Sequence, residues 1–155
     1  MGKRAPDDVC RNNFVRLRSL FDSVVPDHAR FQMVYACGVE ARMSYTLVTR
    51  TTAYTYASYA VGFDVAANEI VIVPVPPDLS SHGKPVYLAH NEITSARQSF
   101  VTKEITIKDK RLPRKYVQLI VQDCINEDPD GVCLLVKQDD EAKRFLEFFK
   151  QTYKT

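Results

Sequence analysis

One stretch of the sequence concentrates positive charge, and its side chains could bind an anion. Residues 103–115 read KEITIKDKRLPRK, with six basic side chains against Glu104 and Asp109. The six are Lys103, Lys108, Lys110, Arg111, Arg114 and Lys115. Ammonium and guanidinium groups bind phosphate and carboxylate oxygens. The stretch therefore predicts a basic turn for a phosphorylated ligand, an anionic lipid or an acidic protein segment. The alternative is a solvated turn whose lysines prevent edge-to-edge strand pairing.

A second group of reactive side chains, DLSSHGK at 78–84, combines an aspartate, two serines and a histidine. A serine nucleophile needs a base within hydrogen-bonding reach and a third group that orients the base. Close neighbours in one loop do not have that arrangement, and the sequence has no GxSxG motif. We interpret the segment as a polar surface loop and expect a protein that is not an enzyme.

Signatures of metal and cofactor sites are missing from the sequence. The histidines, His28, His82 and His90, are scattered, and no two cysteines have the CxxC spacing that zinc sites use. Neither a Gly-rich phosphate loop nor a dinucleotide-binding fingerprint occurs. We therefore predict no metal and no cofactor.

Four cysteines, at positions 10, 37, 124 and 133, allow two interpretations. Cys124 and Cys133 flank the turn INEDPDG and would face each other across a hairpin. The N-terminal sequence lacks the apolar segment of a secretory signal, which instead favours reduced thiols that pack as small apolar side chains. We expect the second arrangement, in a cytoplasmic protein.

Length and charge limit the classes of protein further. The 155 residues suit one domain, 1–155. With 21 basic and 19 acidic side chains the net charge is +2, too small to indicate a nucleic-acid partner. No run of about 18 apolar residues occurs, so no membrane-spanning helix is expected.

Two segments have helical periodicity, 6–25 and 139–153, because apolar side chains recur every three or four residues. The apolar stripes are Cys10, Phe14, Leu17, Phe21 and Val24 in the first helix, and Ala142, Phe145, Leu146, Phe149 and Tyr153 in the second. Pro26 ends the first helix. Asp7 and Asp8, in its first turn, would stabilise the helix because negative side chains interact favourably with the positive end of the helix dipole.

Between these helices, 29–138 reads as strands separated by turns. The clearest hairpin is VGFDVAANEIVIVPVPPD at 61–78, whose second strand is 69–75. Both faces of that strand are apolar, so we expect it to be covered on both sides. If the strand instead ends a sheet, Val71, Val73 and Val75 would form an adhesive interaction edge.

About seven strands in hairpin succession, followed by the segment GVCLLVKQDDEAKRFLEFFKQTY, resemble a pleckstrin-homology-like (PH-like) barrel from Ala29 to Tyr153. The hairpin also resembles those of small bacterial proteins with this fold. The resemblance implies two bent antiparallel sheets in a partly open barrel, closed at one end by the C-terminal helix. Binding would lie in loops or along a sheet edge. The helix at 6–25 would be an addition to that barrel.

These observations predict a mainly β, α+β protein that is a non-catalytic interaction module. Its expected partner is another protein or a second copy of the chain. The alternative is binding of an anionic ligand or a membrane surface through the basic turn 103–115.

Overall fold

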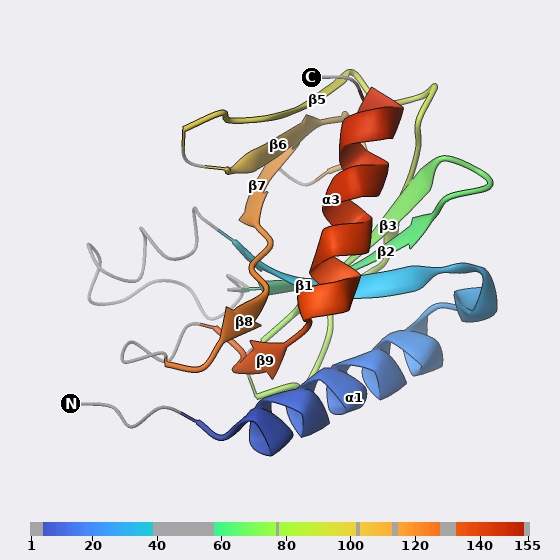
Figure 1. Ribbon diagram of the computed structural model, residues 1–155. Helices are drawn as coiled ribbons and strands as arrows, with labels where there is room; N and C mark the ends of the chain where they lie inside the picture. Colours follow the sequence, from blue (N-terminus) through green and yellow to red (C-terminus); the bar gives the residue numbers. More distant parts are fainter. Residues whose placement is uncertain are drawn as a thin grey trace, which may run out of the picture.

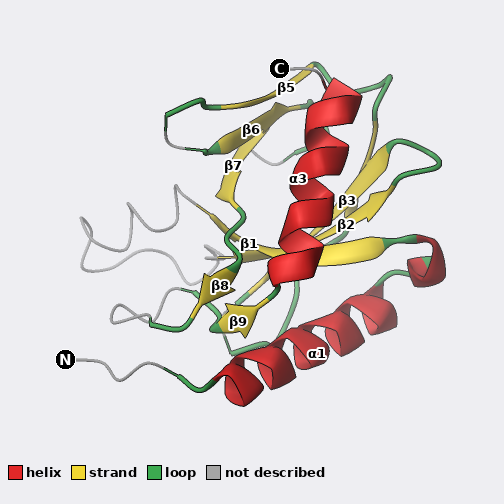
Figure 2. Cartoon of the chain, in the orientation of Figure 1, coloured by secondary structure: helices red, strands yellow, loops and turns green. Residues whose placement is uncertain are grey.

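The computed structural model describes residues 5–38, 58–76, 78–101, 103–112, 115–127 and 133–153 (Figure 1). Two helices flank a mainly β structure, α1 (Asp7–Val24) and α3 (Asp139–Tyr153). The main sheet consists of β1 (Gln32–Gly38), β2 (Ser58–Asp64), β3 (Glu69–Val75), β4 (Val86–Ala89), β5 (Ser95–Gln98), β6 (Ile105–Lys108) and β7 (Tyr116–Ile120). A second, two-stranded sheet pairs β8 (Cys124–Ile125) with β9 (Val136–Lys137), as Figure 2 also shows. The expected mainly β, α+β class is confirmed.

The strands of the main sheet follow the order β4-β3-β2-β1-β7-β6-β5, and all pairs are antiparallel. β1 joins two hairpin-built halves. Among the described residues it pairs with β2 through six residues, and with β7 through Cys37 and Gly38. The described strands do not close into a barrel, in agreement with a partly open one.

The joint between the two halves depends on the side chain of Gln138, which is fully buried just before α3. Its Oε1 accepts from the Tyr35 backbone N–H at 2.7 Å. Its Nε2 donates to the carbonyl oxygens of Tyr35 at 2.9 Å and Gln122 at 2.7 Å. Where β1 and β7 diverge, one carboxamide thus satisfies backbone groups that would otherwise be buried without partners.

In the β1–β3 half of the main sheet each face is covered by one helix, because apolar side chains alternate along the strands. Met33, Tyr35 and Cys37 of β1 face α1, whereas Val34 and Ala36 belong to the cluster under α3. The same alternation in β3 places three valines toward α1 and two isoleucines toward α3. The expectation that 69–75 is covered on both faces is confirmed.

Helix α1 begins after Pro6 and carries Asp7 and Asp8 in its first turn. It packs on β1, β2 and β9. Close approach to β2 requires Gly62, since a Cβ at that position would lie 2.5 Å from Cζ of Phe21. The absence of a side chain at one strand position therefore lets the helix reach the sheet.

Helix α3 lies across the bend of the sheet and covers both halves (Figure 1). Its buried side chains are Ala142, Phe145, Phe148 and Phe149. Phe63 of β2 contacts Phe145 and Phe148, with ring centroids 5.3 Å apart in each case. The aromatic side chains of α3 thus connect the helix to the β1–β3 half.

The rest of the predicted strand region 29–138, as far as it is described, is divided between the two sheets. The segment GVCLLVKQ does not extend the main sheet, because β9 pairs with β8. Residues 86–98 form two strands, β4 and β5, on opposite edges of the sheet. Part of the predicted strand region, 39–57, lies outside the described residues.

A disulfide joins Cys37, near the end of β1, to Cys133, with 6.0 Å between the Cα atoms. Cys10 and Cys124 are free thiols. The expectation of four reduced cysteines is therefore wrong, as is a Cys124–Cys133 pair. The cytoplasmic location stays a prediction. In the described part of the chain, no helix has the length and apolar character needed to cross a membrane.

We predict that Gln138→Leu lowers the free energy of unfolding by about 2–4 kcal/mol, because it leaves buried backbone groups of Tyr35 without partners. Urea unfolding followed by circular dichroism measures the effect. Gln151→Leu, at an exposed position of α3, is the matched control and should change stability by less than about 0.5 kcal/mol. Equal stability of the two variants would contradict the role of Gln138.

For the disulfide, alkylation of the denatured, unreduced protein should modify only the two free thiols, Cys10 and Cys124. Reduction should expose all four cysteines and lower the free energy of unfolding by about 2–5 kcal/mol, because the bond closes a long loop. Mass spectrometry counts the labels. Four labels without reductant would show that Cys37 and Cys133 are not bonded.

Candidate functional site

The outer half-sheet β5–β6–β7 has one face that neither helix covers. The register aligns Ala96, Ile107 and Val117 on the side packed against α3. Arg97, Thr106 and Gln118 form the adjacent row, whose side chains point to the opposite side. Helix α1 packs on β1, β2 and β9 and not on this half. We call the side that carries Arg97, Thr106, Lys108, Tyr116 and Gln118 the open face.

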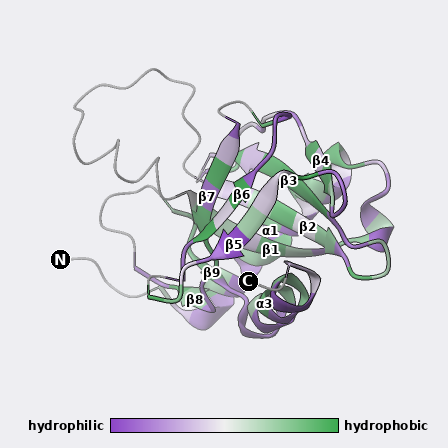
Figure 3. Ribbon diagram, turned by 90° about the horizontal axis from the view of Figure 1, so that it is seen from above, coloured by the Kyte–Doolittle hydropathy of each residue, from purple (hydrophilic) through white to green (hydrophobic). Residues whose placement is uncertain are grey.

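The open face is hollowed, with a volume of about 740 Å³. Besides the five side chains that define the face, its lining includes Phe100 and Glu104. In Figure 3 hydrophilic colouring marks β5, whereas β2 and β3 are largely hydrophobic. A concave surface with converging polar groups is the usual form of a ligand site.

Two cations on the open face are not used by the fold. Neither Arg97 nor Lys108 has an ion pair or a side-chain hydrogen bond within the described part of the chain. Glu104, the acid in the lining, accepts a hydrogen bond from Gln118 Nε2 at 2.8 Å. The positive charge of the hollow is therefore available to a ligand.

The loop between β5 and β6 forms a rim with exposed apolar groups. Phe100 is 90% exposed and Val101 84% exposed. The loop is closed by a hydrogen bond from the Lys103 N–H to the Ser99 carbonyl at 3.0 Å, and Lys103 has a positive φ of 67°. The Lys103 ammonium lies 5.3 Å from the centroid of the Phe100 ring. The rim thus presents an aromatic and an aliphatic side chain on a closed turn.

The predicted basic turn 103–115 is not one turn, because 105–108 form strand β6. Lys103 lies on the rim at one end of β6, and Lys108 lies on the open face. Lys110 and Lys115 follow the other end of the strand. Arg114 lies outside the described residues. The described cations of the expected cluster are therefore spread over both ends of β6 and the open face.

Arg111, at the centre of the predicted basic turn, is neutralised by its own turn. Its Nε and Nη2 donate to Asp109 at 2.8 and 2.7 Å, and its Nη1 lies 3.2 Å from Glu92. The hydrogen bonds from Arg111 hold the pKa of Asp109 below its ordinary value. The turn is built around this pair, so Arg111 is a structural residue and not a free anion ligand.

The predicted interaction edge at Val71, Val73 and Val75 is not exposed. All three side chains are 0% accessible and belong to the cluster under α1. β3 lies between β2 and β4. The prediction of an adhesive edge at these valines is wrong, because two-sided apolarity here reflects a central strand.

The sequence interpretation missed Arg97, which stands in the short segment SARQ. Its relevance depends on the pairing of β5 with β6, which places it opposite Thr106. Period-two alternation in 95–98 and 105–108 gives a weak indication of a polar face. Nothing in the sequence shows that α1 leaves that face open.

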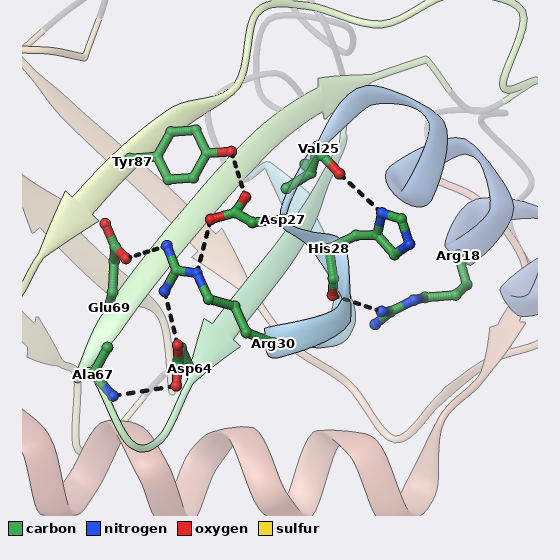
Figure 4. Close-up of polar contacts among 9 residues, drawn as sticks. All are labelled: Arg18, Val25, Asp27, His28, Arg30, Asp64, Ala67, Glu69 and Tyr87. Atoms are coloured by element: carbon green, nitrogen blue, oxygen red, sulfur yellow. Dashed lines mark hydrogen bonds and ion pairs between the residues drawn. The ribbon is translucent and has the colours of Figure 1, made fainter.

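A second charged cluster surrounds Arg30 next to the β2–β3 hairpin (Figure 4). Its guanidinium contacts Asp27, Asp64 and Glu69, each at 2.7 Å. Tyr87 Oη donates to Asp27 at 3.0 Å. Every acid in the cluster is paired with Arg30, so we assign it to holding the helical turn before β1 on the hairpin.

The first turns of α1 and α3 lie close together and bring acids and bases into a smaller hollow of about 380 Å³. Arg11 forms two hydrogen bonds with Glu141, at 3.1 and 2.7 Å. Lys137 lies 3.0 Å from Asp139. Since both cations there are paired, this cluster joins the two helices. No group of three potential metal ligands occurs in the described ranges.

The candidate catalytic loop 78–84 does not form a triad in its described residues. Ser80 Oγ donates to Asp78 at 2.6 Å, while the His82 ring faces the carbonyl of Gly83 at 2.9 Å. His90 packs against Tyr153, with ring centroids 5.2 Å apart. The two histidines therefore do not converge on the serine.

Comparisons with known proteins give no relative: no family model, no curated protein and no solved structure matches the chain. The site must therefore be interpreted from its own geometry.

The Arg30 cluster predicts acid-sensitive stability. Partial burial raises the pKa of Asp64, but hydrogen bonds from Arg30 and from the backbone of the turn outweigh this effect and hold that pKa below its ordinary value. The pKa of Asp27 is lowered in the same way, against the opposing effect of burial. A carboxyl with a lowered folded-state pKa adds stability above its ordinary pKa, and that contribution is lost as the pH falls through the folded-state value.

We therefore expect Arg30→Met to lower the free energy of unfolding by about 1–2 kcal/mol at pH 7, allowing for solvent screening. The difference from wild type should shrink below about pH 4. Urea unfolding between pH 7 and pH 3 measures it. Arg16→Met, at an exposed position of α1, is the control. A constant difference at all pH values would contradict the assigned ion pairs.

Proposed function

We propose that this protein is a non-catalytic binding module whose open face binds a protein partner. The observation that carries the proposal is the unequal covering of the sheet. Helices bury both faces of β1–β3. The hollow on β5–β7, in contrast, holds two cations, Arg97 and Lys108, that have no ion pair with any other described residue. A concave surface that neither described helix covers is suited to binding.

The rim supports a protein as the partner. Exposed apolar side chains that lie together are typical of interaction sites, and aromatic and arginine side chains are enriched in them. Phe100 and Val101 provide the apolar part, and Arg97 lies beside them in the hollow. A second copy of the chain would meet the same surface and is included in the proposal.

Element order and the position of α3 support a PH-like architecture as part of this proposal. The resemblance implies binding through loops or a sheet edge. β5 is an edge strand, and the rim is the loop that follows it. The alternative, anion binding by a basic turn, has less support because Arg111 is already paired.

Site-specific photocrosslinking in intact cells that express the protein tests the proposal. A photoreactive benzoylphenylalanine at position 106, on the open face, should crosslink to a discrete protein. The same group at position 143, an exposed site on α3, is the matched control and should not. The adduct at position 106 should also disappear when Phe100 is replaced by serine. Identical adducts at both positions, or none at position 106, would refute binding at the open face.

A further inference from the structure

The arrangement of the unpaired cations indicates what kind of segment the open face would bind, an inference that rests on the proposed function. Arg97 pairs with Thr106, and Lys108 lies two residues further along β6. Such diagonal neighbours on adjacent strands are about 7–8 Å apart. Alternate side chains of an extended peptide are separated by about 6.6–6.8 Å. Two acidic side chains at positions i and i+2 would therefore match the two cations.

The remaining groups of the hollow give the site a direction along the strands. The Lys108 and Tyr116 row comes first, the Arg97 and Gln118 row follows, and the rim with Phe100 lies beyond. Glu104, next to the rim, would repel a further acid there. An apolar side chain of the ligand is favoured next to Phe100, because burying the exposed ring removes apolar surface from water.

We propose that the open face binds an extended segment of a partner protein with two acidic side chains at alternate positions, followed by an apolar side chain. The first acid pairs with Lys108, the second with Arg97, and the apolar group covers Phe100. The hollow, at about 740 Å³, is within the roughly 300–1,000 Å³ range of small-ligand sites and accommodates only a few side chains. Recognition is thus confined to a short motif.

Fluorescence anisotropy with three labelled ten-residue probes tests this inference. The first probe contains Glu-Val-Glu followed by two leucines, the second has Gln in place of Glu, and the third has Lys. At about 50 mM salt the Glu probe should bind at least about tenfold more tightly than the Gln probe, and the Lys probe most weakly. The preference should shrink at about 300 mM salt, because exposed charges are screened.

Variants locate the binding. The double variant Arg97→Gln and Lys108→Gln should weaken binding of the Glu probe about tenfold, and Phe100→Ser should weaken binding of both the Glu and Gln probes. Lys143→Gln together with Lys150→Gln, at exposed positions of α3, is the matched double control and should leave the affinity within about twofold. Thermal unfolding verifies that each variant is folded. Loss of affinity in the control double variant would show non-specific attraction of charge and overturn the proposal.

Two further arms distinguish other anions from an acidic peptide. Inorganic phosphate and vesicles containing phosphatidylserine are titrated against the wild type. Binding to vesicles without binding of the Glu probe would overturn the proposal in favour of a membrane surface, and tight phosphate binding alone would favour a free anion. Equal affinity for the Glu and Gln probes would refute the acidic motif, while the crosslink at position 106 would still support a protein partner. Failure of both experiments would remove both proposals.

Discussion

The structure depends on how the Gln138 carboxamide bridges the diverging strands β1 and β7. Tyr35 lies on β1 where the sheet separates, and both of its backbone hydrogen-bonding groups are satisfied by this one side chain. The same amide reaches Gln122, just beyond β7. Gln138 also immediately precedes α3, so the bend of the sheet and the start of the helix are fixed together. A buried amide of this kind costs stability unless all its bonds are made, which confines the chain to one arrangement.

The bend determines which surfaces the helices cover. One helix lies under β1–β3, and the other crosses the inside of the bend and contacts both halves. The Cys37–Cys133 disulfide adds a covalent link at the joint, since Cys37 is one of the two β1 residues that pair with β7. Neither α1 nor α3 packs on the side of β5–β7 away from α3. Its openness is thus a consequence of the same geometry that forms the core.

The cationic side chains differ in the same way between the packed parts of the protein and the open face. Arg11, Arg30 and Arg111 each pair with carboxylates that hold a turn or helix end in place. Arg97 and Lys108 have no such role among the described residues. Each partly exposed ion pair contributes little to the free energy of unfolding. The main effect of these pairs is therefore to position the segments that they connect. Cations without partners in a hollow instead remain available for a ligand, which is why they support the proposed binding surface.

The two helices, the β2–β3 hairpin and the mainly β class were predictable, because they follow from local periodicity and turn residues. The sequence also indicated correctly that strand 69–75 is covered on both faces. Four features became evident only in the folded chain: Val71, Val73 and Val75 are core, Cys37 is bonded to Cys133, Arg97 and Lys108 lie on the same face of the sheet, and Arg111 is paired. Each of these depends on contacts between segments distant in the chain, and neither composition nor spacing records which segments meet. The open face was not predictable for the same reason: it exists where a distant helix does not pack.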